Sequence, residues 1–256
     1  MMAELPHFFI PKDHFQGEVI FVTGDPLHHL KQVLRLKEGD LAILLDGIGG
    51  CCRVRLEHLT RNSARALVLE RWQEIETALP IHLLQGLPKG DKFDLILQKG
   101  TELGITSFHP VLTQRSVPQP DSQRLAKRYQ RWDRIVSEAA RQSRRCVLPK
   151  ISPLQPLSRT LPPDADNLRL VLWEAGARPF SSVLPERRPK AVSLLVGPEG
   201  GFAADEIVLI EESGYQPVHM GPRILRTETA GLAAAGILQY LYGDLNRAPH
   251  ESEEIP

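Results

Sequence analysis

The stretch that decides the fold is residues 192–242, VSLLVGPEGGFAADEIVLIEESGYQPVHMGPRILRTETAGLAAAGILQYLY. It opens with the apolar run Val192–Val196, which predicts a buried strand that stops at the glycine-rich residues 197–201. A second short strand near residues 217–220 stops in the same way at Gly221 and Pro222. In open α/β sheets, ligands bind beyond the carboxyl ends of the strands. The two turns therefore predict a ligand site at one edge of a mostly parallel sheet.

The composition of these loops narrows the class of ligand. The chain contains neither the dinucleotide pattern GxGxxG nor the phosphate-binding pattern GxxxxGK[ST]. The helix after the first loop carries Asp205 and Glu206 in its first turn, and these carboxylates neutralise the positive end of its dipole. A phosphate group would be poorly placed there, whereas a neutral nucleoside or a cation would be accepted.

Two longer motifs carry a resemblance to a known family. LLVGPEGG at residues 194–201 and GPRILRTETA at 221–230 resemble the signature of the RsmE family. The likeness extends over nearly the whole chain, through HHLKQVLRLKEGD, QKGTELGI and EAARQSRR. Members of that family belong to the SPOUT superfamily and methylate N3 of a uridine in 16S rRNA with S-adenosylmethionine as cofactor. The resemblance implies an α/β fold with a mostly parallel sheet and a C-terminal trefoil knot, plus a small PUA-like β-barrel domain at the N-terminus.

Residues for cofactor binding are expected on three loops. A strand ending near Trp173 leads into the third loop, beside the two Gly/Pro turns. S-adenosylmethionine needs main-chain groups for its adenine and ribose and a site that tolerates a sulfonium. The cofactor-binding residues implied are Leu172, Glu174, Val196, Gly197, Pro198, Glu199, Gly200, Gly201, Met220, Gly221, Ile224, Leu225, Arg226 and Thr229.

The expected chemistry sets the catalytic candidates. N3 of uracil carries a proton, so the enzyme must offer a base or cationic groups that stabilise the uracil anion. We expect Arg226 to stabilise negative charge on a uracil carbonyl oxygen and Glu199 or Glu228 to accept the proton. His219 lies inside a predicted strand and is expected to be structural.

The length of 256 residues and a change in sequence pattern along the chain predict two domains. Short apolar runs separated by Gly and Asp predict a PUA-like RNA-binding domain at residues 1–75, with a linker over residues 71–79. Alternating strand and helix signals then predict the SPOUT methyltransferase domain at 76–246. The polar residues 247–256 are expected to form a disordered tail.

Basic residues are concentrated in a few segments, although the formal net charge is zero. A helix that begins near Asp25 and Pro26 is expected to bury Leu27, Leu30, Val33 and Leu34 and to expose basic side chains. Residues 121–150, mostly a helix predicted at 122–145, carry nine Lys and Arg against three Asp and Glu. The expected RNA-binding residues are Lys31, Arg35, Lys89, Lys92, Arg141, Arg144 and Arg145.

Two of these positions depart from the family pattern. Arg141 stands where an acidic residue is common, and Arg144 stands where glycine is common. Both changes add positive charge, which suits an RNA substrate.

The rest of the composition indicates which metals, which cellular location and which partners to expect. The three cysteines show no metal-ligand spacing and no disulfide framework, so we expect no metal and a cytoplasmic location. No apolar stretch reaches the ~18 residues that span a bilayer. The expected partners are 16S rRNA in the small ribosomal subunit and a second copy of the chain, packed through the last helix at 229–242; neither DNA nor a membrane is expected.

Two other functions are compatible with the sequence. A SPOUT methyltransferase could act on tRNA or on a ribose 2′-OH, and an RNA-binding assembly factor could retain vestigial cofactor loops. The complete RsmE-type motifs argue against both.

Overall fold

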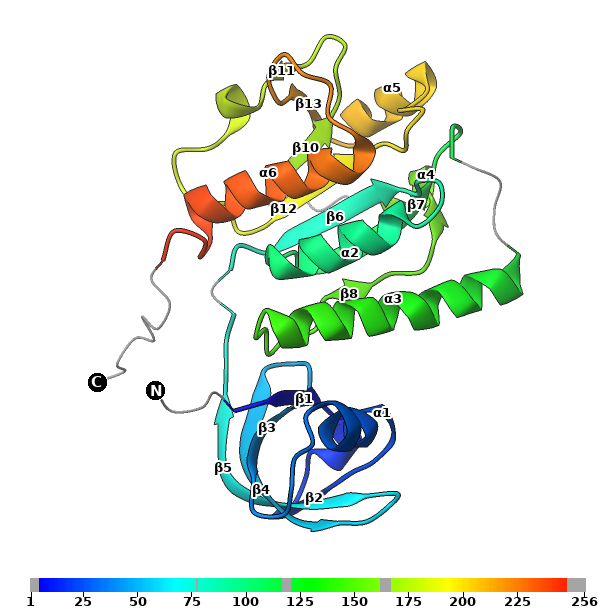
Figure 1. Ribbon diagram of the computed structural model, residues 1–256. Coiled ribbons are helices and arrows are strands. Elements are labelled where there is room, and N and C mark those ends of the chain that lie inside the picture. The colour runs from blue at the N-terminus through cyan, green and yellow to red at the C-terminus, as the bar shows by residue number, and fades with distance from the viewer. Residues whose placement is uncertain (1–4, 77, 117–120, 162–166, 248–256) are drawn as a thin grey trace. The chain divides into compact units, whose positions relative to one another are not determined.

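The computed structural model describes residues 5–76, 78–116, 121–161 and 167–247 (Figure 1). The chain forms two compact units, Met1–Glu76 with Ser137–Leu148 and Thr77–Val136 with Pro149–Pro256. The segment 137–148 therefore packs with the first unit, although the sequence-based division assigned it to the second domain. The predicted disordered tail lies outside the described residues from residue 248 onward.

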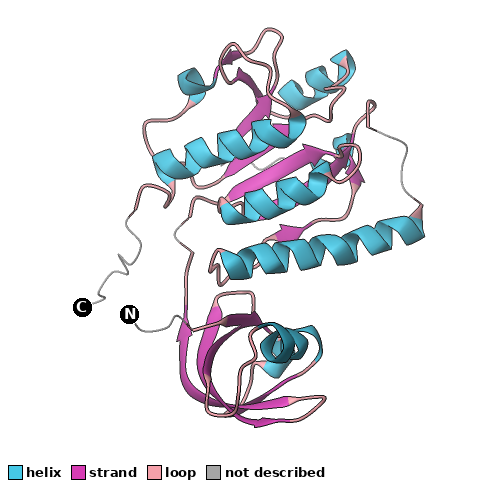
Figure 2. Ribbon diagram, viewed as in Figure 1, coloured by secondary structure: helices cyan, strands magenta, loops and turns pink. Residues whose placement is uncertain are grey.

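The first unit is built on a curled five-stranded sheet in the order β1-β3-β4-β5-β2 (Figure 2). Its strands are β1 (His7–Phe9), β2 (Val19–Val22), β3 (Leu41–Leu45), β4 (Gly50–Leu59) and β5 (Ala64–Gln73). The pairing is antiparallel except between β1 and β3. Alternate residues of β4, Cys52, Val54 and Leu56, are buried in one core. Residues 71–73, predicted as linker, are instead the end of β5.

The helical part of this unit differs from the expected regular helix. A 3-10 turn, η1 (Lys12–His14), precedes β2; after β2, α1 (Gly24–His28) continues as a π-helix, η2 (His29–Val33). Leu27 and Leu30 are buried as predicted, but Val33 and Leu34 are 58% and 40% exposed. The prediction for these two residues was wrong because a π-turn has a longer repeat than an α-turn, which rotates the residues after it away from the buried face.

The second unit contains an eight-stranded sheet in the order β11-β13-β10-β12-β6-β7-β8, with β9 beside β7. Its strands are β6 (Ile81–Gly86), β7 (Ser107–Leu112), β8 (Lys150–Ile151), β9 (Gln155–Pro156), β10 (Leu168–Leu172), β11 (Arg178–Pro179), β12 (Val192–Val196) and β13 (Gln216–His219). Every described pairing in it is parallel. The predicted mostly parallel α/β fold is confirmed. Strand order does not record how the chain is threaded, so the trefoil knot stays a prediction.

Helices cover both faces of this sheet. Figure 1 shows α2 (Lys92–Glu102) and α6 (Thr227–Tyr242) side by side on one face. On the other face, α4 (Leu157–Thr160) and α5 (Ala204–Glu212) contribute to a core with β10, β12 and the aromatic Phe202. The long helix α3 (Ser122–Gln142) belongs to the second unit up to residue 136, and a short 3-10 turn, η3 (Phe180–Val183), follows β11. No helix in the described part of the chain has the length and apolarity to cross a bilayer.

The two interior glycines of α6 differ in their packing. A Cβ atom on Gly231 would lie 3.2 Å from side-chain carbons of Leu83 and Val196, so glycine lets α6 approach the sheet closely. A Cβ atom on Gly236 would meet only Leu103, at 3.9 Å. Close packing inside the unit therefore accounts for the first glycine and not for the second.

The start of α5 lacks a capping side chain, because its N-cap residue is Ala203. The buried carboxylate of Glu206 replaces it, because it accepts a hydrogen bond from the backbone N–H of Ala203 at 2.9 Å. Its other oxygen accepts one from the N–H of Gln114 at 2.8 Å, which ties α5 to the loop after β7.

Among the described residues, Arg35 and Arg144 are the non-glycine residues with positive φ, at 54° and 62°. A side chain in this left-handed region costs roughly 1–2 kcal/mol through crowding of Cβ against the backbone. Arg144 occupies the position where glycine is common in the family, and glycine would adopt this φ without the penalty. The arginine side chain at this position therefore comes with backbone strain.

Replacing Arg144 by glycine and by alanine isolates that strain, because both changes remove the same side-chain contacts. We expect Arg144→Gly to unfold at higher urea concentration than Arg144→Ala, by about 1 kcal/mol in free energy. Gln142, the last residue of α3, is the control, since alanine is the better residue in a helix. If alanine is the more stable replacement at both positions, the strain at Arg144 is refuted.

Candidate active site

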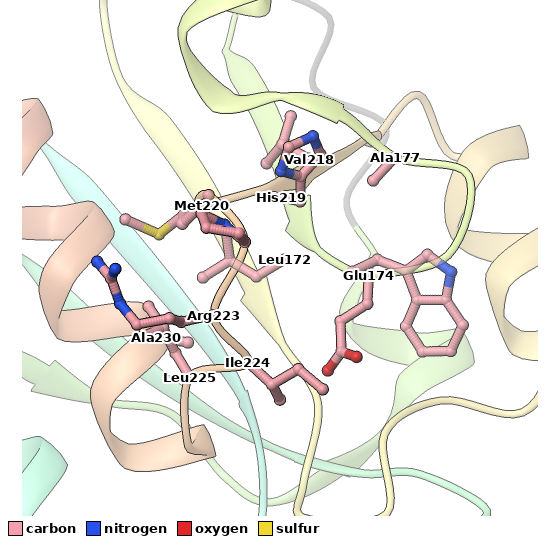
Figure 3. Close-up of a pocket in the computed structure, with 13 residues that line it drawn as sticks. Leu172, Glu174, Ala177, Val218, His219, Met220, Arg223, Ile224, Leu225 and Ala230 are labelled. Carbon is pink, nitrogen blue, oxygen red and sulfur yellow. The ribbon is translucent and has the colours of Figure 1, made fainter.

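Two adjoining cavities of about 370 and 460 Å³ lie at the carboxyl ends of β10, β12 and β13. They share six lining residues, Leu172, Trp173, Glu174, Ile224, Leu225 and Ala230. Figure 3 shows the larger one, with the carboxylate of Glu174 on the same side as Ile224. The structure therefore places a cavity at the sheet edge that the two Gly/Pro turns predicted.

Most of the predicted cofactor residues line these cavities. Leu172, Glu174, Ile224 and Leu225 line both; Met220 and Gly221 line the larger; and Val196, Gly197, Pro198, Glu199, Gly201 and Arg226 line the smaller. Gly200 and Thr229 line neither. The carbonyl oxygen of Gly200 instead accepts a hydrogen bond from Arg115 at 2.8 Å, and Thr229 is exposed on α6.

The first loop can approach the sheet only because a neighbouring strand ends in glycine. A Cβ atom on Gly86, the last residue of β6, would lie 2.4 Å from Cδ and 2.6 Å from the backbone nitrogen of Pro198. Such distances require the backbone itself to move. Gly86 therefore allows the loop at 197–201 to pack against the end of β6.

Four charged side chains meet beside the smaller cavity. Nζ of Lys92 lies 2.8 Å from Oε1 of Glu199 and 3.7 Å from Oε2 of Glu228. Nη1 of Arg226 lies 3.9 Å from the other oxygen of Glu228. The three catalytic candidates are thus brought together with Lys92, which the sequence had suggested only as an RNA contact.

The two carboxylates have different environments. Burial acts to raise the pKa of Glu199, but hydrogen bonds from Lys92 and from backbone N–H groups, including that of Lys89, outweigh it and lower that pKa below its usual value. The hydrogen bond to Glu199 in turn raises the pKa of Lys92. Oε2 of Glu228 is buried and has no hydrogen-bond partner among the described residues, although Lys92 is close. The two carboxylates therefore differ in how fully their oxygens are hydrogen-bonded.

A buried hydrogen-bond junction, which the sequence did not reveal, joins the loops of the site. Thr227 Oγ1, at the start of α6, donates to the carbonyl oxygen of Gly197 at 2.6 Å. The amide of Gln85, fully buried at the end of β6, donates to Thr227 Oγ1 at 2.9 Å and to the same carbonyl at 3.3 Å. The only signal in the sequence was a polar residue at the end of the apolar run IHLLQG.

Trp173 is a second residue that sequence reasoning missed. It follows β10, lines both cavities and packs against Phe202, with ring centroids 6.1 Å apart. An aromatic side chain directly after a strand that leads into the predicted site could have indicated it.

The expected RNA-binding residues of the first unit differ in how exposed they are and in whether they already contact other residues. Lys31 is partly buried and donates to the carbonyl oxygen of Thr60 at 2.8 Å, and Arg141 contacts Nε2 of His29. Arg35 and Arg144 are exposed.

Arg145, by contrast, is only 9% exposed and makes a two-point ion pair with Glu76, at 2.8 and 2.7 Å. Its guanidinium is therefore held inside the first unit rather than presented at the surface, and its expected contact with RNA stays a prediction.

Comparison with known families first defines the class of protein. Residues 75–239 match the RNA methyltransferase domain family, and residues 22–69 match the PUA domain that accompanies RNA methyltransferases. The chain therefore belongs to the RNA methyltransferases that carry a PUA domain.

Individual relatives then specify the family. Ribosomal RNA small subunit methyltransferase E of Bacillus subtilis is 36% identical over 229 residues, which cover 86% of this chain and 89% of the relative. The crystal structure of the enzyme of that name from Neisseria gonorrhoeae, bound to S-adenosyl methionine, has a TM-score of 0.85 at 34% identity and covers 94% of this chain and 100% of that one. A putative methyltransferase from Legionella pneumophila, also in complex with the cofactor, has a TM-score of 0.85 at 29% identity, over 95% and 100% of the two chains. The chain belongs to the ribosomal RNA small subunit methyltransferase E (RsmE) family.

The junction around Gly197 generates a prediction about stability. Thr227→Val keeps the side-chain shape but removes the hydroxyl that donates to Gly197 and accepts from Gln85, so we expect a loss of about 1–3 kcal/mol in the free energy of unfolding. Thr229→Val, two residues further along the same helix at an exposed position, should change it by less than about 0.5 kcal/mol. Chemical denaturation of the two variants measures the difference. Equal stabilities would show that the junction does not hold the loops.

Proposed function

We propose that this protein transfers a methyl group from S-adenosylmethionine to N3 of a uridine in the ribosomal RNA of the small subunit. The observation that carries the proposal is the cluster of Arg226, Glu228, Lys92 and Glu199 beside the smaller cavity. The names of the relatives, and the cofactor bound in two related structures, support the substrate and the methyl donor.

The residues around the cavities fit a bent nucleoside with a sulfonium group. The loop at 197–201 and the turn at Gly221 offer backbone polar groups with little side-chain cover, and a Cβ atom on Gly221 would meet nothing within 4 Å. Glu174 places a carboxylate at both cavities, where it suits ribose hydroxyls and a cationic sulfur. We propose the lining residues of both cavities as the cofactor site; the cofactor supplies an electrophilic methyl group.

The acceptor base must lose a proton while negative charge develops on its carbonyl oxygens. The side chain of Arg226 is 82% exposed, so it can turn toward the base and stabilise that charge. We assign Glu228 as the proton acceptor because its buried oxygen lacks a hydrogen-bond partner among the described residues. Glu199, whose pKa is lowered, is already hydrogen-bonded to Lys92, whereas one oxygen of Glu228 makes no hydrogen bond among the described residues.

RNA recognition is proposed for both units. In the PUA-like unit, the exposed Arg35 and Arg144 are the strongest candidates, with Lys31 and Arg141 as supporting cations that already bind within the unit. In the methyltransferase unit, Lys89 is exposed on the loop before α2. Basic side chains such as these bind RNA mainly through its phosphates. We propose residues 1–75, together with the segment 137–148 that packs with them, as the RNA-binding domain, the rest of 76–246 as the catalytic domain and the assembled small subunit as substrate.

A homodimer is also proposed, through α6. Ile237, Tyr240 and Leu241 are 41%, 59% and 48% exposed on this helix, and Gly236 lacks close neighbours within its own unit. A second copy of α6 would cover these side chains and account for the second glycine.

The proposed activity predicts a single site of modification. Incubating the purified protein with S-adenosylmethionine and small ribosomal subunits from a strain that lacks the gene should methylate one uridine at N3, found by mass mapping of rRNA fragments. Bare RNA of the same sequence should be a much poorer substrate. Methylation of a ribose 2′-OH, or of tRNA in preference to the subunit, would overturn the assignment.

Arg226 is the sharpest test of the proposed chemistry. We expect Arg226→Ala to lower kcat by about 100-fold or more while the Kd for S-adenosylmethionine changes far less, since the loss falls on the transition state. The wild-type rate should rise with pH as the uracil ionises more readily. Arg178→Ala, an exposed arginine of β11 that lines neither of these two cavities, is the control and should keep near-normal kcat. Near-normal turnover by Arg226→Ala would refute the role.

A further inference from the structure

Three potential metal ligands converge in the first unit, whereas the residues assigned to methyl transfer belong to the second. Sγ of Cys51, Sγ of Cys146 and a carboxylate oxygen of Glu74 all lie within 4.8 Å of one another. Both thiols approach the same atom, Oε2 of Glu74, at 3.9 Å from Cys51 and 3.2 Å from Cys146. The two cysteines are distant in the sequence, so their spacing gave no sign of the cluster.

The two sulfur–oxygen separations are close to those of ligands around a tetrahedral zinc ion. With Zn–S of about 2.3 Å and Zn–O of about 2.1 Å, tetrahedral angles place a sulfur and an oxygen ligand about 3.6 Å apart. The two S···O distances in the cluster, 3.2 and 3.9 Å, lie on either side of that value. Small side-chain rotations would therefore be enough to seat an ion.

Backbone hydrogen bonds already hold the three ligand-bearing segments together. The N–H of Gly49 donates to the carbonyl oxygen of Cys146 at 3.3 Å, and the N–H of Glu74 donates to that of Gly49 at 2.8 Å. Gly49 has a φ of 100°, and a Cβ atom there would lie 2.5 Å from the carbonyl oxygen of Glu74. A glycine is therefore needed where the loop between β3 and β4 meets the other two segments, and the ligands are positioned before any ion binds.

The ligand types select the kind of ion. Two thiolates and one carboxylate suit zinc and similar first-row ions, whereas calcium and magnesium prefer oxygen ligands. Cys51 and Cys146 are buried, but Glu74 is exposed, which leaves the fourth position open to water. We propose that Cys51, Glu74 and Cys146 form a binding site for Zn²⁺ that fastens the segment after α3 to β4 and β5.

Cobalt(II) absorption tests this site directly in the full-length protein. We expect the reduced, metal-free protein to bind one Co²⁺ per chain with thiolate-to-cobalt charge-transfer bands, and Zn²⁺ to displace the Co²⁺. Cys51→Ala and Cys146→Ala should lose these bands. Glu74→Gln, at an exposed position that does not threaten folding, should keep thiolate absorption and bind the ion about ten- to a hundredfold more weakly.

Cys52→Ala is the matched control. Cys52 is the adjacent thiol, but it is buried in the core of the curled sheet and is absent from the cluster. This variant should bind Co²⁺ as the wild type does, and Zn²⁺ should raise the melting temperature of both. Circular dichroism of each metal-free variant separates loss of the site from loss of the fold.

Three results would overturn the proposal. One is reduced wild-type protein that shows no charge-transfer bands, and another is a Cys51→Ala spectrum equal to that of Cys52→Ala. The third is a Cys51–Cys146 disulfide in the protein as isolated, detected by mass spectrometry without reduction, together with no metal binding after reduction. None of these measurements depends on methyltransferase activity, so they test the metal site independently of the proposed reaction.

Discussion

The carbonyl oxygen of Gly197 is the point on which the candidate active site depends. A parallel sheet brings the ends of its strands to one edge, but the loops that follow still need fixed positions. Here the carbonyl is buried where water cannot satisfy it, and it accepts hydrogen bonds from Thr227 and Gln85. Since an unpaired buried carbonyl is costly, the end of β6, the loop after β12 and the start of α6 are held in one arrangement.

This arrangement explains how four charged groups come to share a small space. Lys92 begins α2, Glu199 lies in the loop after β12, and Arg226 and Glu228 flank Thr227 at the start of α6. Each charged group has an opposite charge beside it, which favours its charged form and offsets the free-energy cost of bringing the four groups together. Glu199 is committed to Lys92, so the two carboxylates differ in availability although they are of the same chemical type.

In the first unit, the two arginines that depart from the family pattern, Arg141 and Arg144, have different surroundings. Arg141 lies against His29, and burial, followed by the positive charge of Arg141, lowers the pKa of that imidazole. A neutral His29 can accept a hydrogen bond from the guanidinium, so an arginine is accommodated where an acidic residue is common. Arg144 is exposed in a left-handed conformation, whereas its neighbour Arg145 is turned inward to Glu76. Three arginines in one short segment therefore have three different roles.

The sequence by itself determined the fold class, the strand Val192–Val196, the turns that end in glycine and most of the residues that line the cavities. Hydrophobic period and Gly/Pro turns are local properties, and parallel strands bring their carboxyl ends to one edge, so these patterns predicted the strand, the turns and the place of the ligand site. The individual cofactor residues were implied by the resemblance of the motifs to the RsmE family. The tertiary structure alone decided that Lys92 joins Glu199 and Glu228, that Gln85 and Thr227 hold Gly197, and that Arg145 is buried. It also decided that Val33 and Leu34 are exposed after a π-turn, and that Cys51 meets Cys146. These are contacts between residues far apart in the chain, or shifts of helical repeat, and the path of the folded backbone sets both.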